Sequence, residues 1–388
     1  MEENRLKEYI SLRKELHRHP EISGLEEHTA KRITDFLIKR DPDQLLEGLG
    51  GHGVAAVFDG QKDGPSVMIR CELDALPIEE ANDFAHRSTK PGVSHKCGHD
   101  GHMVMVAALA DWLAEEKKKL HGRVILLFQP AEENGAGALA VLEDPQFASI
   151  RPDYAFALHN LPGYPMHQIL WGNGQFNPAV QSMAIHLRGK AAHAAEPHNG
   201  LNPAWAIADL IQTFAEWNVE DPLHEDFRLI TPVHIKLGEK DYGISPGAGE
   251  LHLTMRCWDT EKMVKLGSCI ILKIIELSDQ NRHNLLFETR NLDEFPAVIN
   301  DDVCNQIIQK AAHENNFELV EMKPPCTFGE DFGHFSQRIP SAMFGLGAGQ
   351  NTSALHHADY DFSDELLPTG IQMFQSIISE ILSRESDT

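Results

Sequence analysis

The 388-residue sequence is poor in basic residues and has no long apolar run. It carries 34 Lys and Arg against 58 Asp and Glu, a formal net charge of −24, which disfavours nucleic acid and anionic membrane surfaces as partners. No segment approaches the roughly 18 apolar residues of a membrane span. The first residues, Met1 to Leu6, lack the basic and then apolar pattern of a signal peptide. We therefore expect a cytoplasmic protein that binds neither nucleic acid nor membrane.

The sequence also lacks a disulfide pattern. Its six cysteines are spread along the chain, without the spacing of a small disulfide-bonded scaffold and without a Cys-x-x-Cys pair. Any cysteine with a role is therefore a thiolate ligand, a nucleophile or core filler. The 22 histidines, by contrast, are more than packing alone suggests, so their positions indicate where chemistry takes place.

Strand-like and helix-like patterns alternate in the first part of the chain. Apolar runs at 66–71, 123–128 and 154–158 alternate with helical patterns, among them an amphipathic helix expected from Met103 to Leu120. This alternation favours helices on both faces of a largely parallel sheet. Ligand sites in such sheets lie at the carboxyl ends of the strands.

The pattern changes near Gln175 and changes back after Phe295. Between these points the order β-α-β-β-α-β is typical of the split βαβ arrangement. We therefore predict an α/β fold with a mixed, largely parallel sheet sandwiched by helices, carrying an inserted α+β, ferredoxin-like lid domain. The predicted boundaries are 1–174 and 295–388 for the catalytic, metal-binding domain and 175–294 for the inserted lid or dimerisation domain.

Four polar clusters fall at predicted strand ends or in loops of the outer domain. They are Cys97 to His102, Glu132-Glu133, Leu158 to Asn160 and Leu355 to His357. Each is weak evidence alone, because an isolated histidine is usually a hydrogen-bonded surface or core residue. Together they supply one sulfur, at least three imidazoles and a carboxylate, the ligand mix expected for zinc or a neighbouring first-row metal. The absence of a closed four-cysteine set disfavours a purely structural zinc.

The acid pair Glu132-Glu133 directly follows the apolar run 123–128. Buried like charges repel each other and lose hydration, so such a pair is tolerated mainly where a cation or a proton divides their roles. Our hypothesis is that Glu133 holds metal and that Glu132 moves protons.

Seven sequence blocks occur in the order found in one enzyme family. They are His17 to Ser23, Glu72 to Pro77, His95 to His102, Phe128 to Glu133, Gly189 to His193, Gly329 to Phe332 and Leu355-His356. The chain resembles the binuclear metallo-amidohydrolases, which include aminoacylases, hippurate hydrolases, N-acetyl-diaminopimelate deacetylases and auxin-conjugate hydrolases and are relatives of the zinc carboxypeptidases with an inserted lid domain. The resemblance covers nearly the whole chain.

The resemblance implies two divalent metal ions per chain, zinc or manganese, and a set of ligands. The implied ligands are Cys97, His99, Glu133, His159 and His356, with Cys97 in the bridging position. Glu132 would be the general base and acid. His356 is preferred over His357 because it directly follows Leu355, as in the family's Leu-His block.

Three further residues are candidates for supporting roles. Asp74 matches an acid that would orient a ligand histidine such as His99; the alternative is a helix or turn cap. His193 matches a histidine that in relatives reaches the substrate, often from the partner subunit; the alternative is an exposed loop histidine. Arg256 is a candidate for binding the substrate carboxylate, which a guanidinium matches with two donors. Glu72 stands where the family usually has Asp, which affects the fine geometry rather than the ligand set.

The expected reaction is hydrolysis of the amide bond of an N-acyl amino acid, as in a deacetylase or aminoacylase. A hydroxide bridging the two metal ions would attack the carbonyl carbon, with Glu132 taking and returning the proton. We expect a small-molecule substrate and a homodimer or larger homo-oligomer. Three alternatives stay open: a dipeptidase or carboxypeptidase using the same metals, a non-catalytic metal-binding protein, and a hydrolase with Cys97 as nucleophile.

Overall fold

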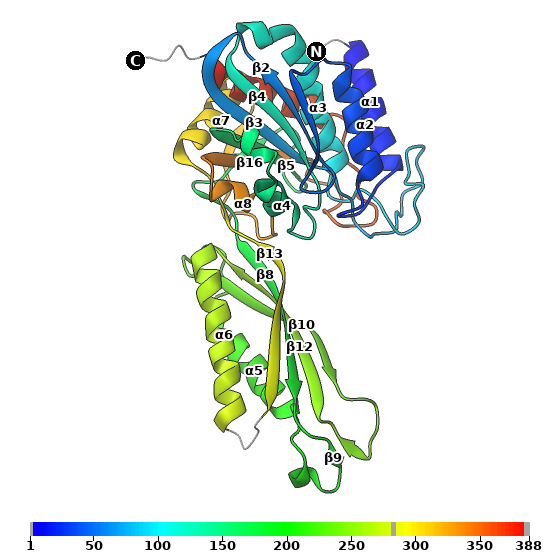
Figure 1. Ribbon diagram of the computed structural model, residues 1–388, viewed down its shortest axis with the longest axis vertical. Helices are drawn as coiled ribbons and strands as arrows, with labels where there is room; N and C mark the ends of the chain where they lie inside the picture. The colour runs from blue at the N-terminus through cyan, green and yellow to red at the C-terminus, as the bar shows by residue number, and fades with distance from the viewer. Residues whose placement is uncertain (1–2, 281–284, 384–388) are drawn as a thin grey trace. The chain divides into compact units, whose positions relative to one another are not determined.

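The computed structural model describes residues 3–280 and 285–383, and the chain divides into two compact units (Figure 1). Unit 1 comprises Met1–Phe176, Val298–Lys323 and Glu330–Thr388, and unit 2 comprises Asn177–Ala297 and Pro324–Gly329. The expected boundaries lie within three residues of the first and last residues of the long segment of unit 2. They did not include the short segment Pro324–Gly329, which also belongs to unit 2.

Unit 1 is built on an eight-stranded sheet with the order β1-β2-β4-β3-β5-β16-β6-β15. The strands are β1 (Gln44–Leu49), β2 (Gly53–Asp59), β3 (Lys62–Glu72), β4 (His121–Gln129), β5 (Tyr154–Leu161), β6 (Ile169–Trp171), β15 (Leu319–Glu321) and β16 (Ser341–Gly347). The central strands β4, β3, β5 and β16 are mutually parallel, whereas β2 and β6 pair with them antiparallel. The prediction of a mixed, largely parallel sheet is confirmed.

Helices lie on both faces of this sheet. They are α1 (Glu3–Arg18), α2 (Glu27–Ile38), α3 (His99–Glu116), α4 (Gly137–Glu143), α7 (Asp302–Glu314), α8 (Gly333–Ser336) and α9 (Leu366–Leu382). Val124, Leu126 and Phe128 of β4 share one core with α1, α2, α3, α7 and α9. Because side chains alternate along a strand, Ile125 and Leu127 point to the other face, and they are fully buried there too. The short helices α4 and α8 contact each other and the sheet outside that core.

Helix α3 differs from its prediction in a way that matters for the site. It begins at His99 rather than at Met103, because Gly98 adopts a left-handed φ of 100° and serves as its N-cap residue. All residues from His99 to Ala110 are buried, so the expectation of an amphipathic helix with a solvent face there is wrong. His99 and His102 therefore lie on the first turn of a central helix instead of in a loop.

Unit 2 contains a four-stranded antiparallel sheet, in the order β10-β12-β8-β13, with two helices packed on it (Figure 1). Its main elements are β8 (Ala179–Arg188), α5 (Ala204–Trp217), β10 (Arg228–Leu237), β12 (Ala248–Cys257), α6 (Thr260–Gln280) and β13 (Leu286–Phe295). Met183, Ile185 and Leu187 of β8 share a core with α5 and α6. Element order and strand order together give the expected ferredoxin-like arrangement.

The described chain also contains three short 3₁₀ helices, Lys117–Lys119, Phe147–Ser149 and Pro197–Asn199, and four short strands. The strands are β7 (Gln175–Asn177) with its partner β14 (Val298–Ile299), and β9 (Ala192–His193) with its partner β11 (Ile244–Ser245). Across residues 3–280 and 285–383, no helix has both the length and the apolar character needed to cross a membrane.

Candidate metal centre

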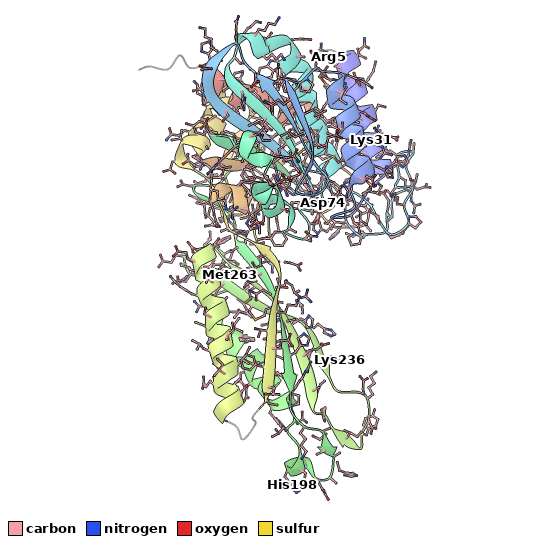
Figure 2. The ribbon with its side chains drawn as sticks, viewed as in Figure 1. Arg5, Lys31, Asp74, His198, Lys236 and Met263 are labelled. Atoms are coloured by element: carbon pink, nitrogen blue, oxygen red, sulfur yellow. The ribbon has the colours of Figure 1, made fainter. Side chains whose placement is uncertain are left out.

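Polar side chains from neighbouring strands and from the start of α3 meet at one edge of the sheet in unit 1. Asp74 follows β3, the pair Glu132-Glu133 follows β4, and His159 lies near the end of β5. Figure 2 labels Asp74 at this edge. Since β3, β4 and β5 are parallel, their carboxyl ends meet where an open α/β sheet usually binds its ligand.

The five predicted ligands form interlocking groups here. Within each group the potential ligand atoms lie within 4.8 Å of one another. The groups that contain them are Cys97 with His99 and His159, Cys97 with Glu133 and His356, His99 with Glu132 and Glu133, and His99 with Glu72 and His102. Cys97 belongs to two groups, so its sulfur lies between two sets of donors.

Glu132 and Glu133 both approach the ring of His99. The Nε2 atom of His99 lies 3.8 Å from Oε2 of Glu132 and 3.9 Å from Oε1 of Glu133. Among the described residues, neither His99 Nε2 nor Glu133 Oε1 has a hydrogen-bond partner, although both atoms are buried. A buried polar atom without a partner destabilises a fold by roughly 1–3 kcal/mol. A divalent cation would satisfy both atoms, and the set of sulfur, imidazole and carboxylate donors fits zinc or a similar first-row ion.

The chemistry of Cys97 points to the same conclusion. Burial raises the pKa of its thiol well above the ordinary value, and the nearby carboxylate of Glu133 raises it further. The thiolate therefore forms only when a cation lies beside the sulfur. The same shift makes Cys97 a poor nucleophile on its own.

His159 is held in the form that metal binding requires. Its Nδ1 donates to the backbone carbonyl oxygen of Asn160 at 2.8 Å, which leaves Nε2 as the atom 3.4 Å from Cys97 Sγ. Burial, with a contribution from His102, lowers the pKa of His159 to about 3. The ring is therefore neutral at pH 7, and metals bind neutral imidazole.

His356 lies at the solvent side of the cluster. Its Nε2 is 3.6 Å from Oε2 of Glu133, and its side chain is 52 % exposed. The residue adopts a φ of 64°, and its backbone N–H donates to the carbonyl oxygen of Lys96 at 2.8 Å. The adjacent His357 is exposed and belongs to none of the donor groups found in the described part of the chain.

Asp74 connects His99 with Glu133. His99 Nδ1 donates to the backbone carbonyl oxygen of Asp74 at 2.8 Å and lies 3.6 Å from its carboxylate. The carboxylate also accepts from the backbone N–H of Glu133 at 2.9 Å and from the hydroxyl of Ser23 at 2.7 Å. Asp74 therefore constrains two candidate ligands at once.

Glu132 belongs to a second, purely acidic group with Glu330 and Asp331. Burial raises the pKa of Glu132 well above its ordinary value, and the negative charges of Glu330, Glu133 and Asp331 raise it further. Glu330 and Asp331 both lie in the Gly329 to Phe332 sequence block.

Arg70 is a buried charged residue beside the candidate site, and no sequence motif singled it out. Its guanidinium is fully buried and contacts Glu72, Glu330 at 3.1 Å and Asp331 at 2.6 Å. A charged residue inside an otherwise apolar strand was the available signal, because a buried charge requires a partner.

The departure at Glu72 now has a structural account. One oxygen of Glu72 contacts Arg70 and the other lies 2.7 Å from Nδ1 of His102. Nε2 of His102 in turn lies 2.5 Å from Oδ1 of Asn160, the residue after His159. The longer acid thus reaches His102 on the first turn of α3.

His193 and Arg256 lie in unit 2, so they are not among the side chains that unit 1 brings together. His193 is exposed in β9, opposite Ile244, and its Nδ1 accepts from the backbone N–H of Ala195 at 3.1 Å. Arg256 lies in β12, where its Nε donates to the carbonyl oxygen of Thr327 at 3.0 Å.

Known proteins resemble this chain over nearly its whole length. Residues 68–380 match the family described as Peptidase family M20/M25/M40. The chain is 32% identical over 346 residues to N-acetyl-L-cysteine deacetylase of Bacillus subtilis (strain 168), covering 88% of this chain and 80% of the relative. It is 30% identical over 377 residues to N-acetyldiaminopimelate deacetylase of Anoxybacillus flavithermus, covering 96% and 97% of the two chains.

A solved structure agrees with these sequence matches. The crystal structure of a dinuclear metal-binding peptidase of the M20 family from Bacillus subtilis superposes with a TM-score of 0.84 at 25% identity, covering 98% of this chain and 99% of that one. The resemblance inferred from the seven sequence blocks is therefore confirmed. With a family match across most of its length and full-length relatives at 30% identity or more, the chain belongs to peptidase family M20/M25/M40.

Proposed function

We propose that this protein hydrolyses the amide bond of N-acyl amino acids with the help of two divalent metal ions, zinc or manganese. One observation carries the proposal: the structure separates the environments of two neighbouring acids. Glu133 lies in a donor group with Cys97 and His356, whereas Glu132 also belongs to an acidic group with Glu330 and Asp331. Relatives of the chain are named as deacetylases of N-acetylcysteine and N-acetyldiaminopimelate, which supports a small acyl group as the part removed.

The proposed ligands are Cys97, His99, Glu133, His159 and His356, with Cys97 shared between the two ions. When bound, two such ions polarise an amide carbonyl and lower the pKa of an attacking water. Support for two positions comes from the two donor groups that share the Cys97 sulfur and from the dinuclear metal-binding relative from Bacillus subtilis.

Glu132 is proposed as the group that moves the proton. Its raised pKa brings the carboxyl group closer to the pH range in which it can both take and give a proton. It would accept a proton from the attacking water and donate it to the leaving nitrogen. Asp74 would keep His99 and Glu133 in place through its contacts with both residues.

His193 and Arg256 are proposed to bind the substrate from unit 2, His193 from the same or a partner subunit. His193 is exposed on a short strand, so its ring is accessible to a ligand. Burial lowers the pKa of Arg256, and its hydrogen bond to Thr327 orients the guanidinium. A guanidinium held in this way suits a substrate carboxylate.

We also propose a homodimer or larger homo-oligomer in the cytoplasm. The edge strand β10 carries exposed apolar side chains, Val233, Ile235 and Leu237, and an exposed apolar edge favours pairing with another chain. The six cysteines are free, as expected in a reducing compartment. Sedimentation of the purified protein and fractionation of cells would test the two statements; a monomer, or an extracytoplasmic protein, would contradict them.

The proposed activity is tested with a panel of N-acetyl amino acids, N-benzoyl amino acids and dipeptides. We expect the highest kcat/KM for an N-acyl amino acid, loss of activity with a chelator, and recovery with Zn²⁺ or Mn²⁺. A preference for dipeptides would indicate a dipeptidase. Inactivation by alkylation but not by chelation would indicate Cys97 as the nucleophile, and absence of turnover in a protein with two bound ions would indicate a non-catalytic role.

A further inference from the structure

Three histidines and one glutamate lie together on the sheet of unit 2. They are His186 of β8, His234 of β10, and Glu250 and His252 of β12. His186 lies opposite Glu250, and His234 lies opposite His252. Directly opposite residues in an antiparallel pair have Cβ atoms roughly 4.5–5.5 Å apart on the same face. The four side chains therefore form one patch, which we call the histidine patch.

The histidine patch lies on the face that α5 and α6 leave uncovered. Leu251 and Leu253, which alternate with Glu250 and His252 along β12, pack in the core with these helices. Because successive side chains point to opposite faces, the patch is on the other side of the sheet. Figure 2 labels Lys236, which lies opposite Glu250 in β10, on the side of the sheet away from α6.

Contacts within the patch are polar and centred on Glu250 and His252. Nδ1 of His186 and Nε2 of His234 lie 3.4 Å and 3.5 Å from the two carboxylate oxygens of Glu250. The rings of His186 and His234 each meet the His252 ring edge to face, with centroids 6.1 Å and 5.2 Å apart. Glu250 thus lies between His186 and His234, and the ring of His252 contacts the rings of both histidines.

His252 supplies the observation that points to a ligand. Its Nε2 is buried and has no hydrogen-bond partner among the described residues. A cavity of about 220 Å³ adjoins the patch at His186 and Glu250; Arg188 and Lys236 also line it, whereas His234 and His252 do not.

We infer that His186, His234, His252 and Glu250 form a metal site in unit 2, separate from the centre in unit 1, that takes a divalent transition-metal ion such as Zn²⁺. Imidazole nitrogens are preferred donors for Zn²⁺, Ni²⁺ and Cu²⁺, and a carboxylate completes such sites. The bound ion links β8, β12 and β10.

This site is weaker than the centre in unit 1. In the described chain, the donor atoms of the histidine patch do not all lie within 4.8 Å of one another. Metal binding therefore requires these side chains to adopt new rotamers. His186 and His234 are 40% and 56% exposed, and exposed side chains change rotamer readily. Lys236 repels a cation, but it is paired with Glu239 at 3.5 Å.

The test is a Zn²⁺ titration, measured by isothermal titration calorimetry, of enzyme whose unit 1 centre already holds its metal ions. The wild type is compared with the double variant His186→Ala/His234→Ala and with the control His198→Ala, an exposed histidine elsewhere in unit 2 (Figure 2). We expect one further Zn²⁺ per chain in the wild type and in the control. In the double variant the affinity should fall by at least the roughly 10–100-fold that follows loss of an outer partner of a metal site.

Folding of the double variant is checked by circular dichroism and by its unchanged metal content at the unit 1 centre. The inference is overturned if the loaded wild type binds no further Zn²⁺, if the double variant binds it as tightly as the wild type, or if the control loses it to the same extent. Activity is not part of the readout, so failure here leaves the proposed amide hydrolysis unaffected.

Discussion

At the scale of single residues, Arg70 determines whether the acids around the candidate site can be buried. Its guanidinium contacts Glu72, Glu330 and Asp331, all of which are buried. Even with Arg70 present, burial raises the pKa of Asp331 to about 7. Arg70 therefore contributes to the charge balance of three buried acids near Glu132.

We predict that Arg70→Met lowers the free energy of unfolding by about 3–5 kcal/mol, because it leaves buried carboxylates without their cation. Urea unfolding measures the change. The matched control is Arg123→Met, which removes a half-exposed ion pair with Asp59 and should change the free energy by about 1 kcal/mol or less. Equal effects of the two substitutions would contradict the role given to Arg70.

Motifs predicted the candidate ligands better than they predicted the surrounding charges. Cys97, His99 and Glu133 lie in blocks that identify the family, so their convergence in unit 1 could be foreseen. The partners of Arg70 could not be predicted, because Glu330 and Asp331 lie more than 250 residues away in sequence. No motif near Arg70 connects these two acids with β3. The pairing of charges that are distant in sequence depends on the tertiary structure, and the spacing of residues does not predict it.

At the scale of elements, the start of α3 sets the direction of two candidate ligands. Gly98 separates Cys97 from His99 and adopts a left-handed φ of 100°. A Cβ atom at this position would lie 2.3 Å from Oδ1 of Asn160, the atom that meets His102.

We predict that Gly98→Ala destabilises the protein and lowers its metal content. The left-handed backbone alone should cost about 1–2 kcal/mol, and displacement of Asn160 adds to it. Gly92→Ala is the control, because Gly92 has a φ of 75° but open space around its Cβ position. It should show the backbone cost without loss of metal. The measurements are thermal unfolding and elemental analysis, and a Gly98→Ala protein with full metal content would refute the prediction.

A buried ion pair connects α1 to α3. Nδ1 of His17 lies 2.9 Å from Asp100, and Nε2 lies 3.2 Å from Glu80. Burial opposes the charged ring, but the hydrogen bonds to Asp100 and Glu80 outweigh it and raise the pKa of His17 to about 9. The folded protein therefore holds this proton more tightly than the unfolded chain, in which the pKa is about 6.5.

The stability from protonated His17 should be fully present below about pH 6.5 and lost as the pH rises through about 9. We predict that the difference in unfolding free energy between wild type and His17→Gln is larger at pH 6 than at pH 9.5, by about 3 kcal/mol. Urea unfolding at the two pH values measures it. A difference that does not change with pH would exclude the ion pair.

Element prediction from the sequence succeeded where the hydrophobic pattern was long. The order β-α-β-β-α-β expected between Gln175 and Phe295 matches β8, α5, β10, β12, α6 and β13. Strands such as β6, with three residues, are too short for a period of two to be recognised. The sequence did not predict that α3 begins at His99. The loop before it ends through the left-handed conformation of Gly98, and the sequence alone does not reveal that conformation.

At the scale of the whole molecule, the change of pattern near Gln175 and Phe295 was enough to predict an inserted unit. The segment Pro324–Gly329 was not predictable, because its few residues carry no periodicity. Its place in unit 2 rests on tertiary contacts, among them the hydrogen bonds of Phe328 with Asn177 and of Thr327 with Arg256.

Unit 2 has a hydrophobic core of its own, so we predict that a fragment of residues 177–297 folds cooperatively. Two substitutions on α6 form a matched pair: Ile270 is fully buried, whereas Leu272 is 64% exposed. Ile270→Asp should abolish folding of the fragment because it buries an unpaired charge; Leu272→Asp should leave it folded. Circular dichroism and proton NMR report the outcome, and an unfolded parent fragment would show that unit 2 depends on the rest of the chain.

The central claim is that neighbouring acids perform different tasks, and paired substitutions test it most directly. Metal content and turnover of an N-acetyl amino acid are measured for Glu132→Gln and Glu133→Gln. We predict that Glu132→Gln keeps two ions per chain and loses about 10²–10⁴-fold in kcat, the usual contribution of general acid–base transfer. Glu133→Gln should lose metal. Full turnover in Glu132→Gln, or unchanged metal content in Glu133→Gln, would contradict the division of roles.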